Sequence, residues 1–253
     1  MWLFNFLHLP LSLLLSSQLC AAQSNPLPPG LPILEFEYPN TPWVSPGDVL
    51  RMSDTHPLPR ISGAGLNSSA SYLLVFVDLD VFYEGISTVI LHWYQPDMVV
   101  RQRERAWLER GPHRKNGHGP NKHASSSRYT SGAEYMFPRP PPNTHHRYVY
   151  LVFEQEEEYE FPGCFGHIFP KTFDARAGFD LRQFVAIAGL GRPVAGNYFV
   201  GENDETTVTG TLTTDTSITS RPGPTTTWVR SAPCSQPAVV TPTDTVKVLE
   251  HVR

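Results

Sequence analysis

Two aspartates and two histidines beside apolar, strand-like runs are the residues of this chain best suited to chemistry. Asp78 and Asp80 follow the run 72–77, whose β-branched and aromatic residues predict a buried strand that ends at the two carboxylates. His92 lies inside a second run of this kind, and His146 comes just before a third. Because functional side chains gather where a rigid scaffold ends, the sequence predicts that these four side chains converge on one pocket.

Anion binding is the chemistry that this set of residues fits best. Imidazole N–H groups and backbone amides at strand ends can donate to a phosphate-like or carboxylate group, and a carboxylate beside an imidazole fixes its tautomer. We expect Asp78 and Asp80 to orient the histidines, because two free carboxylates would repel an anion. Taken singly, the same residues have a plainer interpretation, in which His92 is a satisfied core histidine and the aspartates cap turns.

Other kinds of site have little support in the sequence. No serine stands in a Gly-x-Ser-x-Gly turn and no cysteine has a nearby partner histidine, so no hydrolase triad is predicted. The histidines form no short-range pair such as His-x-x-x-His, so we predict no metal site and no cofactor. The formal net charge of −4 does not indicate a nucleic-acid partner. Whether the chain is an enzyme stays open.

The elements that must position these residues are expected to form one mainly β domain over 33–204. The 25 prolines and 18 glycines favour a turn-rich β fold over a helical one. One helix is predicted over 179–189, where Asp180 can cap the first turn and Phe179 is spaced to pack on Phe184.

Four segments lie outside the expected sheet. Residues 1–22 read as a secretory signal that ends Cys-Ala-Ala, with a membrane anchor or a buried N-terminal helix as alternatives. A Pro-rich segment, 23–32, follows it. Residues 101–130 are rich in Lys and Arg and predict a basic surface loop, either merely solvated or guiding an anionic ligand. The Thr-rich tail 205–253 predicts disorder and O-glycosylation.

Secretion would expose the chain to oxidation and glycosylation. Removal of residues 1–22 would leave Cys164 and Cys234, which are then candidates for one disulfide. Asn67 begins the sequon Asn-Ser-Ser in a polar stretch, which is either an N-glycan acceptor or an ordinary turn. A vacuolar location is an alternative destination within the same pathway.

The order of these motifs resembles the phosphatidylethanolamine-binding protein family, in the form of a divergent secreted fungal member. Members carry Asp-Pro-Asp-x-Pro, a histidine-bearing strand, a Pro-Pro stretch and Gly-x-His-Arg in the same order. The similarity runs from about residue 33 to 203 and rests on Asp78-Leu79-Asp80, Leu91-His92-Trp93, Pro140–Pro142, His146-Arg147-Tyr148 and Pro193–Gly196.

The resemblance implies antiparallel β-sheets with a few short helices and a shallow anion pocket. The implied pocket residues are Asp78, Asp80, His92, His146 and Tyr148, with Pro141 in the wall. The chain departs from the family at Leu79 and Phe82, where both prolines of Asp-Pro-Asp-x-Pro are absent, and at Thr144, where the family has glycine. Threonine does not readily replace a glycine of positive φ, so the rim is expected to be rebuilt for a ligand other than a lipid head group.

Family members of this kind imply two classes of function. Relatives encoded beside polyketide pathways are associated with dimerising cyclisation of maleic-anhydride monomers, next to a separate cyclase, which makes the expected ligand a small anion or an anhydride. The alternative is a secreted protein that binds a phospholipid head group or inhibits a serine carboxypeptidase. A third possibility is that the pocket is vestigial and the protein structural, because a fold does not fix a function.

Overall fold

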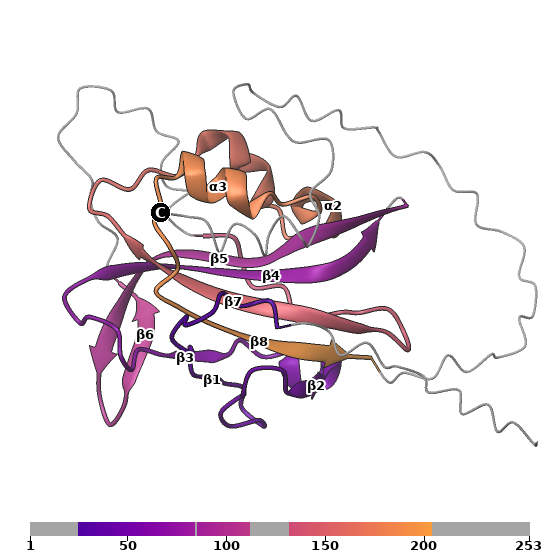
Figure 1. Cartoon of the computed structure of the whole chain (residues 1–253), viewed down its shortest axis with the longest axis horizontal. Helices are drawn as coiled ribbons and strands as arrows, with labels where there is room; N and C mark the ends of the chain where they lie inside the picture. Colours follow the sequence, from indigo (N-terminus) through magenta and orange to yellow (C-terminus); the bar gives the residue numbers. More distant parts are fainter. Residues whose placement is uncertain (1–24, 84, 112–131, 204–253) are drawn as a thin grey trace, which may run out of the picture.

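The computed structural model describes residues 25–83, 85–111 and 132–203. Within these ranges eight strands form one curled sheet, in the order β1-β3-β6-β5-β4-β7-β8-β2 (Figure 1). Neighbouring strands are antiparallel except β2 and β8, which are parallel. The strands are β1 (Phe36–Glu37), β2 (Val49–Arg51), β3 (Arg60–Ser62), β4 (Ser71–Tyr83), β5 (Ile86–Gln102), β6 (Ala106–Arg110), β7 (His145–Gln155) and β8 (Ala195–Glu202).

Helices are few and short, as predicted. The α-helices α2 (Phe173–Arg176) and α3 (Leu181–Ile187) lie on one face of the sheet, and two 3-10 helices, η1 (Met52–Thr55) and η2 (Gly163–Ile168), connect other elements (Figure 1). The mainly β class is therefore confirmed.

Strand β4 is apolar on both faces because the curled sheet is covered on both. Its odd-numbered side chains, such as Val75 and Val77, belong to the core cluster that includes α3. Its even-numbered side chains, such as Leu74 and Phe76, pack in a second cluster together with Phe36 of β1. Alternation of side chains along a strand explains the division. It also sends Asp78 toward the second cluster.

The predicted strands form, but they extend beyond the predicted ends. Asp78 and Asp80 lie inside β4, and His146 lies inside β7 rather than just before it. Proline cannot donate a ladder hydrogen bond, whereas Leu79 and Phe82 leave the backbone free to pair. Accordingly β4 continues against β5 as far as Tyr83, opposite Ile86.

The expectation of a basic loop over 101–130 was wrong for its first part. Strand β5 runs to Gln102 and pairs with β6 from Met98↔Arg110 to Gln102↔Ala106. Trp107 and Leu108 of this hairpin are buried, and their burial stabilises a strand that the surrounding charges concealed. Residues 112–131 lie outside the described residues.

The expected helix is confirmed with its capping contacts. In α3 the carboxylate of Asp180 accepts a hydrogen bond from the backbone N–H of Gln183 at 2.9 Å. The rings of Phe179 and Phe184 pack with centroids 5.5 Å apart, as in a hydrophobic staple. The helix ends before Gly189, whose φ of 64° favours glycine.

The predictions for the two ends of the chain concern residues outside the described ranges. The predicted signal 1–22 and the Thr-rich tail 205–253 are among them, and secretion stays a prediction. Leu27, in the Pro-rich segment, is buried in the core cluster with α3, so the described part of that segment belongs to the domain. No helix in the described ranges is long and apolar enough to cross a membrane.

The cysteines and the sequon are tested only in part. Cys164 is disulfide-bonded, and its partner lies outside the described residues, as does Cys234. Asn67 is exposed and its side-chain oxygen accepts a hydrogen bond from Ser69 N–H, so the sequon stands in an ordinary turn on the surface. Its glycosylation stays a prediction.

Candidate functional site

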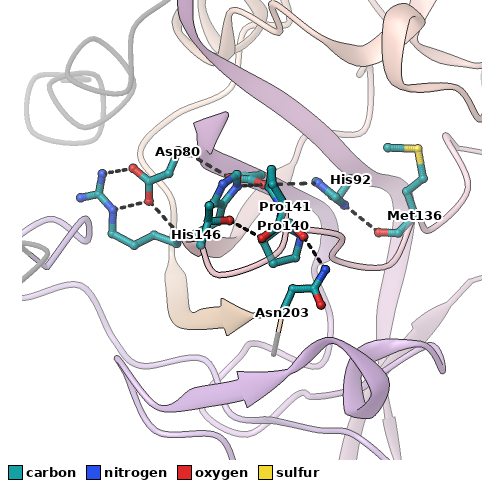
Figure 2. A network of polar contacts seen from close by, with 10 residues as sticks. Asp80, His92, Met136, Pro140, Pro141, His146 and Asn203 are labelled. Atoms are coloured by element: carbon teal, nitrogen blue, oxygen red, sulfur yellow. Dashed lines mark hydrogen bonds and ion pairs between the residues drawn. The ribbon is translucent and has the colours of Figure 1, made fainter. Parts of the chain in front are cut away.

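Three neighbouring strands bring the predicted site residues together (Figure 2). Asp78 of β4 is paired with Tyr148 of β7 on one side and with Ile90 of β5 on the other. His146 lies two residues before Tyr148, and His92 lies two residues after Ile90. The side chains of Asp78, His92, His146 and Tyr148 therefore meet around a single carboxylate.

Irregular pairing of β4 with β5 aims His92 at this carboxylate. Leu91 is paired with Val77 and Trp93 with Phe76, so His92 has no opposite residue. An extra residue of this kind is a β-bulge, which bends the strand and redirects its side chains. Leu91 faces the cluster with α3, whereas the ring of His92 packs on Phe76 of the second cluster.

Asp78 contacts both histidines through one oxygen. His146 donates its Nδ1–H to Asp78 Oδ2 at 2.9 Å, and His92 Nε2 lies 4.0 Å from the same atom. His92 donates its Nδ1–H to the carbonyl of Met136 at 2.8 Å, since a carbonyl can only accept. In the neutral form His92 therefore turns a bare Nε2 lone pair toward Asp78.

The surroundings shift the two imidazoles in opposite directions. Burial lowers the pKa of His92, and the charge of Asp78 offsets this only in part. Burial also lowers the pKa of His146, but there the hydrogen bond and charge of Asp78, with the charge of Asp80, outweigh it, so the pKa is raised. One site thus holds a neutral imidazole beside one that favours protonation, an arrangement that separates base from acid.

Asp80 does not orient a histidine, contrary to the expectation. Its carboxylate accepts from Arg147, from the backbone N–H and from Nε, both at 2.8 Å. Figure 2 shows this ion pair beside His146. Charge in the site is consequently balanced, because Arg147 offsets Asp80 and a protonated His146 offsets Asp78, which removes the repulsion that two free carboxylates would exert on an anion.

Tyr148 packs against both histidines. It is fully buried, and its ring contacts His92 edge to face at 5.3 Å. Gly201 of β8 makes room for it, because a Cβ there would lie 2.5 Å from Tyr148 Cε2. The Tyr148 hydroxyl has no hydrogen bond of good geometry within the described residues, although Asp78 and the backbone of Arg139 lie close enough to shift its pKa. Burial and then the charge of Asp78 raise its pKa well above the ordinary value, so it stays a neutral donor.

The proline stretch forms a turn that leads into β7. The backbone N–H and the hydroxyl of Thr144 both donate to the carbonyl of Pro141, and the Pro140 carbonyl accepts from Asn203 at 2.9 Å (Figure 2). The left-handed residue of this turn is Asn143, with φ of 59°. Thr144 therefore needs no positive φ, which explains how it can stand where the family has glycine. Pro141 is exposed.

The site is more enclosed than the expected shallow pocket. Asp78 is 3% exposed, His92 5% and His146 8%, because the residues lie within strands rather than beyond their ends. Of these three residues, His146 is the most exposed. Among the described residues no group of three or more His, Cys, Asp or Glu side chains could hold a metal ion.

Three contributors were missing from the sequence interpretation. Arg147 was visible in the motif, but its pairing with Asp80 was not. Met136 acts through its carbonyl, which no residue type reveals. Arg176 of α2 is fully buried and donates to the carbonyl of His92 at 3.2 Å, and so helps to hold the bulge. Its position between Ala175 and Ala177 gave a weak signal at best.

Comparison with known proteins identifies the family to which the chain belongs. The family model described as phosphatidylethanolamine-binding protein matches residues 40–199. The chain is 38% identical over 135 residues to phomoidride biosynthesis cluster protein N of Talaromyces stipitatus, which covers 53% of this chain and 60% of the relative. A protein of the same name from another fungal species is 36% identical over 157 residues, 61% of each chain. The chain thus spans about 60% of the length of these relatives.

Solved structures give more distant similarities. A phosphatidylethanolamine-binding protein from Plasmodium vivax has a TM-score of 0.46 and 12% identity, over 69% of this chain and 88% of that one. A carboxypeptidase Y inhibitor, solved in complex with its cognate proteinase, has a TM-score of 0.44 and 18% identity, over 68% of this chain and 83% of that one.

Proposed function

This chain is a member of the phosphatidylethanolamine-binding protein family, and we propose that it is an auxiliary factor in fungal secondary-metabolite biosynthesis. Its candidate site binds a compact carboxylate or anhydride intermediate and assists the dimerising cyclisation of maleic-anhydride monomers beside a separate cyclase. The similarity to the two phomoidride biosynthesis cluster proteins supports the biosynthetic role.

The observation that carries the proposal is the pair of oppositely shifted histidines on Asp78. A protonated His146 can donate to an anionic or developing oxyanion, and a neutral His92 can accept a proton through Nε2. In an anhydride monomer, a proton would pass from a carbon next to the ring to His92. The negative charge would then move onto a ring carbonyl oxygen that His146 stabilises.

Tyr148 supplies a second reason to expect a polar ligand. A buried donor without a partner costs about 1–3 kcal/mol. A ligand oxygen bound between the histidines would satisfy the Tyr148 hydroxyl. A site that keeps such a donor is preorganised for an acceptor.

The proposal is tested in the producing organism with His92→Ala and His146→Ala. Both variants should lose the dimeric product and accumulate monomer, measured by mass spectrometry of extracts. The matched control is His145→Ala, since His145 is an exposed neighbour whose Nε2 lies 3.5 Å from Glu202 rather than in the site. An unchanged metabolite profile at normal protein abundance would refute the biosynthetic role.

A binding assay separates ligand classes with the purified chain. Calorimetric titration with 2,3-dimethylmaleate, inorganic phosphate and phosphoethanolamine should favour dimethylmaleate, and His146→Ala should abolish its binding. Tighter binding of phosphoethanolamine would instead favour a lipid head group. Inhibition of a serine carboxypeptidase stays a prediction, and failure to slow such an enzyme at micromolar concentration would end it.

A further inference from the structure

A cleft adjoins the candidate site and is lined by none of its four central residues. It has a volume of about 740 Å³, and its lining includes Leu58, Trp93, Tyr135 and Phe169. The volume falls in the range of small-molecule sites, about 300–1,000 Å³. Trp93 follows His92 in the chain, and it packs edge to face on Tyr135 with centroids 5.9 Å apart.

Three charged side chains also line this cleft. They are Arg110, Glu134 and Lys171, two cations and one carboxylate. Lys171 Nζ lies 3.7 Å from a Glu134 oxygen, and both side chains are more than half exposed. An exposed pair of this kind contributes little stability, typically about 0–1 kcal/mol. Lys171 is therefore able to turn toward a ligand.

A buried guanidinium lies directly behind the lining. Arg176 is fully buried and donates to the carbonyls of Glu134 at 2.6 Å and Pro170 at 3.2 Å, and both of these residues line the cleft. Its Nη2 has no hydrogen-bond partner in the described part of the chain. Its other hydrogen bonds also go to carbonyls, and no carboxylate in the described residues lies in direct contact with it. The charge of the exposed Glu134 carboxylate acts on it from a distance and offsets only part of the effect of burial, which lowers the pKa of Arg176 to about 10.

A buried charge without a directly contacting counter-ion is costly and attracts an anion. Arginine remains protonated at neutral pH, and its charge is screened less inside the protein than in water. Each carbonyl stabilises the guanidinium but carries no full charge. The positive potential of Arg176 therefore extends into the adjoining cleft, where the two cations Arg110 and Lys171 outnumber the one carboxylate, Glu134.

We propose that this cleft binds an amphipathic carboxylate. The carboxylate group lies between Lys171 and the part of the lining behind which Arg176 is buried. The apolar chain packs on Leu58, Trp93 and Phe169. The proposal is independent of the function proposed for the histidine site. It assigns to the chain a second small-molecule site whose ligand class is set by one cationic end and one apolar wall.

The test is calorimetric titration of the full chain with octanoate, 1-octanol and octylammonium. Octanoate should bind at least about tenfold more tightly than 1-octanol, which is about 1.4 kcal/mol, and octylammonium should bind most weakly. Equal affinity for octanoate and 1-octanol, or no octanoate binding at millimolar concentration, would overturn the proposal.

Exposed residues provide variants that leave the core intact. Leu58→Asp and Lys171→Glu should each weaken octanoate binding about tenfold. Their matched controls are Val49→Asp, since Val49 is 56% exposed against 55% for Leu58, and Arg182→Glu, which makes the same charge change on α3. Controls that weaken binding as much as the cleft variants would refute the assignment.

Competition separates this proposal from the preceding one. Saturating 2,3-dimethylmaleate should leave the octanoate affinity within about twofold, because the two ligands occupy different sites. Displacement of octanoate would mean a single shared site and would overturn the second-site proposal alone. If dimethylmaleate fails to bind, the octanoate titrations with the cleft variants still test whether the cleft is a binding site.

Discussion

His146 donates its Nδ1–H to Asp78 across the β4–β7 pair at 2.9 Å, and both side chains are buried. This contact sets the charge state of the site. In Asp78→Asn the carboxylate charge is lost, so the pKa of His146 should fall from its raised value. Two-dimensional NMR titration of the imidazole C–H signals measures it. An unaltered His146 pKa in this variant would mean that Asp78 does not control its protonation.

The two histidines should make the free energy of unfolding depend on pH with opposite signs. The folded-state pKa of His92 lies below the ordinary 6.5, so the unfolded chain binds more protons in that interval and stability is lost as pH falls below 6.5. The folded-state pKa of His146 lies above 6.5, so its contribution is complete below 6.5 and is lost as pH rises through the folded-state pKa.

Urea denaturation from about pH 5 to about pH 8 tests these signs. His92→Gln should flatten the profile below pH 6.5, and His146→Gln should flatten it above pH 6.5. If both variants flatten the same limb of the profile, the assignment of one neutral and one protonated imidazole is wrong.

Removing the Tyr148 hydroxyl should stabilise the protein while weakening its ligand binding. Tyr148→Phe deletes a buried donor that forms no well-aligned hydrogen bond in the described residues, and the gain should be about 1 kcal/mol. The matched control is Tyr150→Phe, whose hydroxyl lies 2.9 Å from that of Tyr38 and whose loss should cost about 1 kcal/mol. Destabilisation by Tyr148→Phe in urea would show that its hydroxyl is satisfied.

The ion pair of Asp80 and Arg147 should be costly to break from one side. Both side chains are less than one-fifth exposed, so Arg147→Leu should destabilise the fold by about 3 kcal/mol, since it leaves Asp80 unpaired. The double variant Asp80→Asn with Arg147→Leu should recover part of that loss. Chemical denaturation of all four forms gives the coupling energy, and strict additivity would contradict a direct interaction.

The strands could be predicted from local patterns, because a strand that is buried on both faces consists of a continuous run of apolar residues. The runs within β4, β5 and β7 are apolar throughout, and the helix α3 carries its own cap in Asp180. The ends of β4 and β7 were not predictable in the same way. Asp78 and Asp80 look like strand-ending charges, yet residues about 68 positions away neutralise them within the sheet.

The sequence predicted which residues form the candidate site, but not the contacts that bring them together. The order of the motifs identified His92 and His146 as candidates. The bulge at His92 could not be predicted in this way, because it depends on the register in which β4 pairs with β5. Arg176 reads as an ordinary helical arginine. Its burial depends on carbonyls from three separate segments, and a carbonyl has no signature in an amino-acid sequence.

The strand order has a consequence for the way in which the chain acquires its structure. Both edges of the sheet come from the first part of the domain, β1 at one edge and β2 at the other, and β2 pairs with the last strand, Val49 opposite Val200. Asn197 of β8 also holds the carbonyls of Leu34 and Val44 at 2.8 Å. A ribosome must therefore deliver almost the whole domain before β2 finds its partner strand, whereas β1 pairs with the nearby β3. The non-local pairing of β2 favours slow, largely post-translational folding.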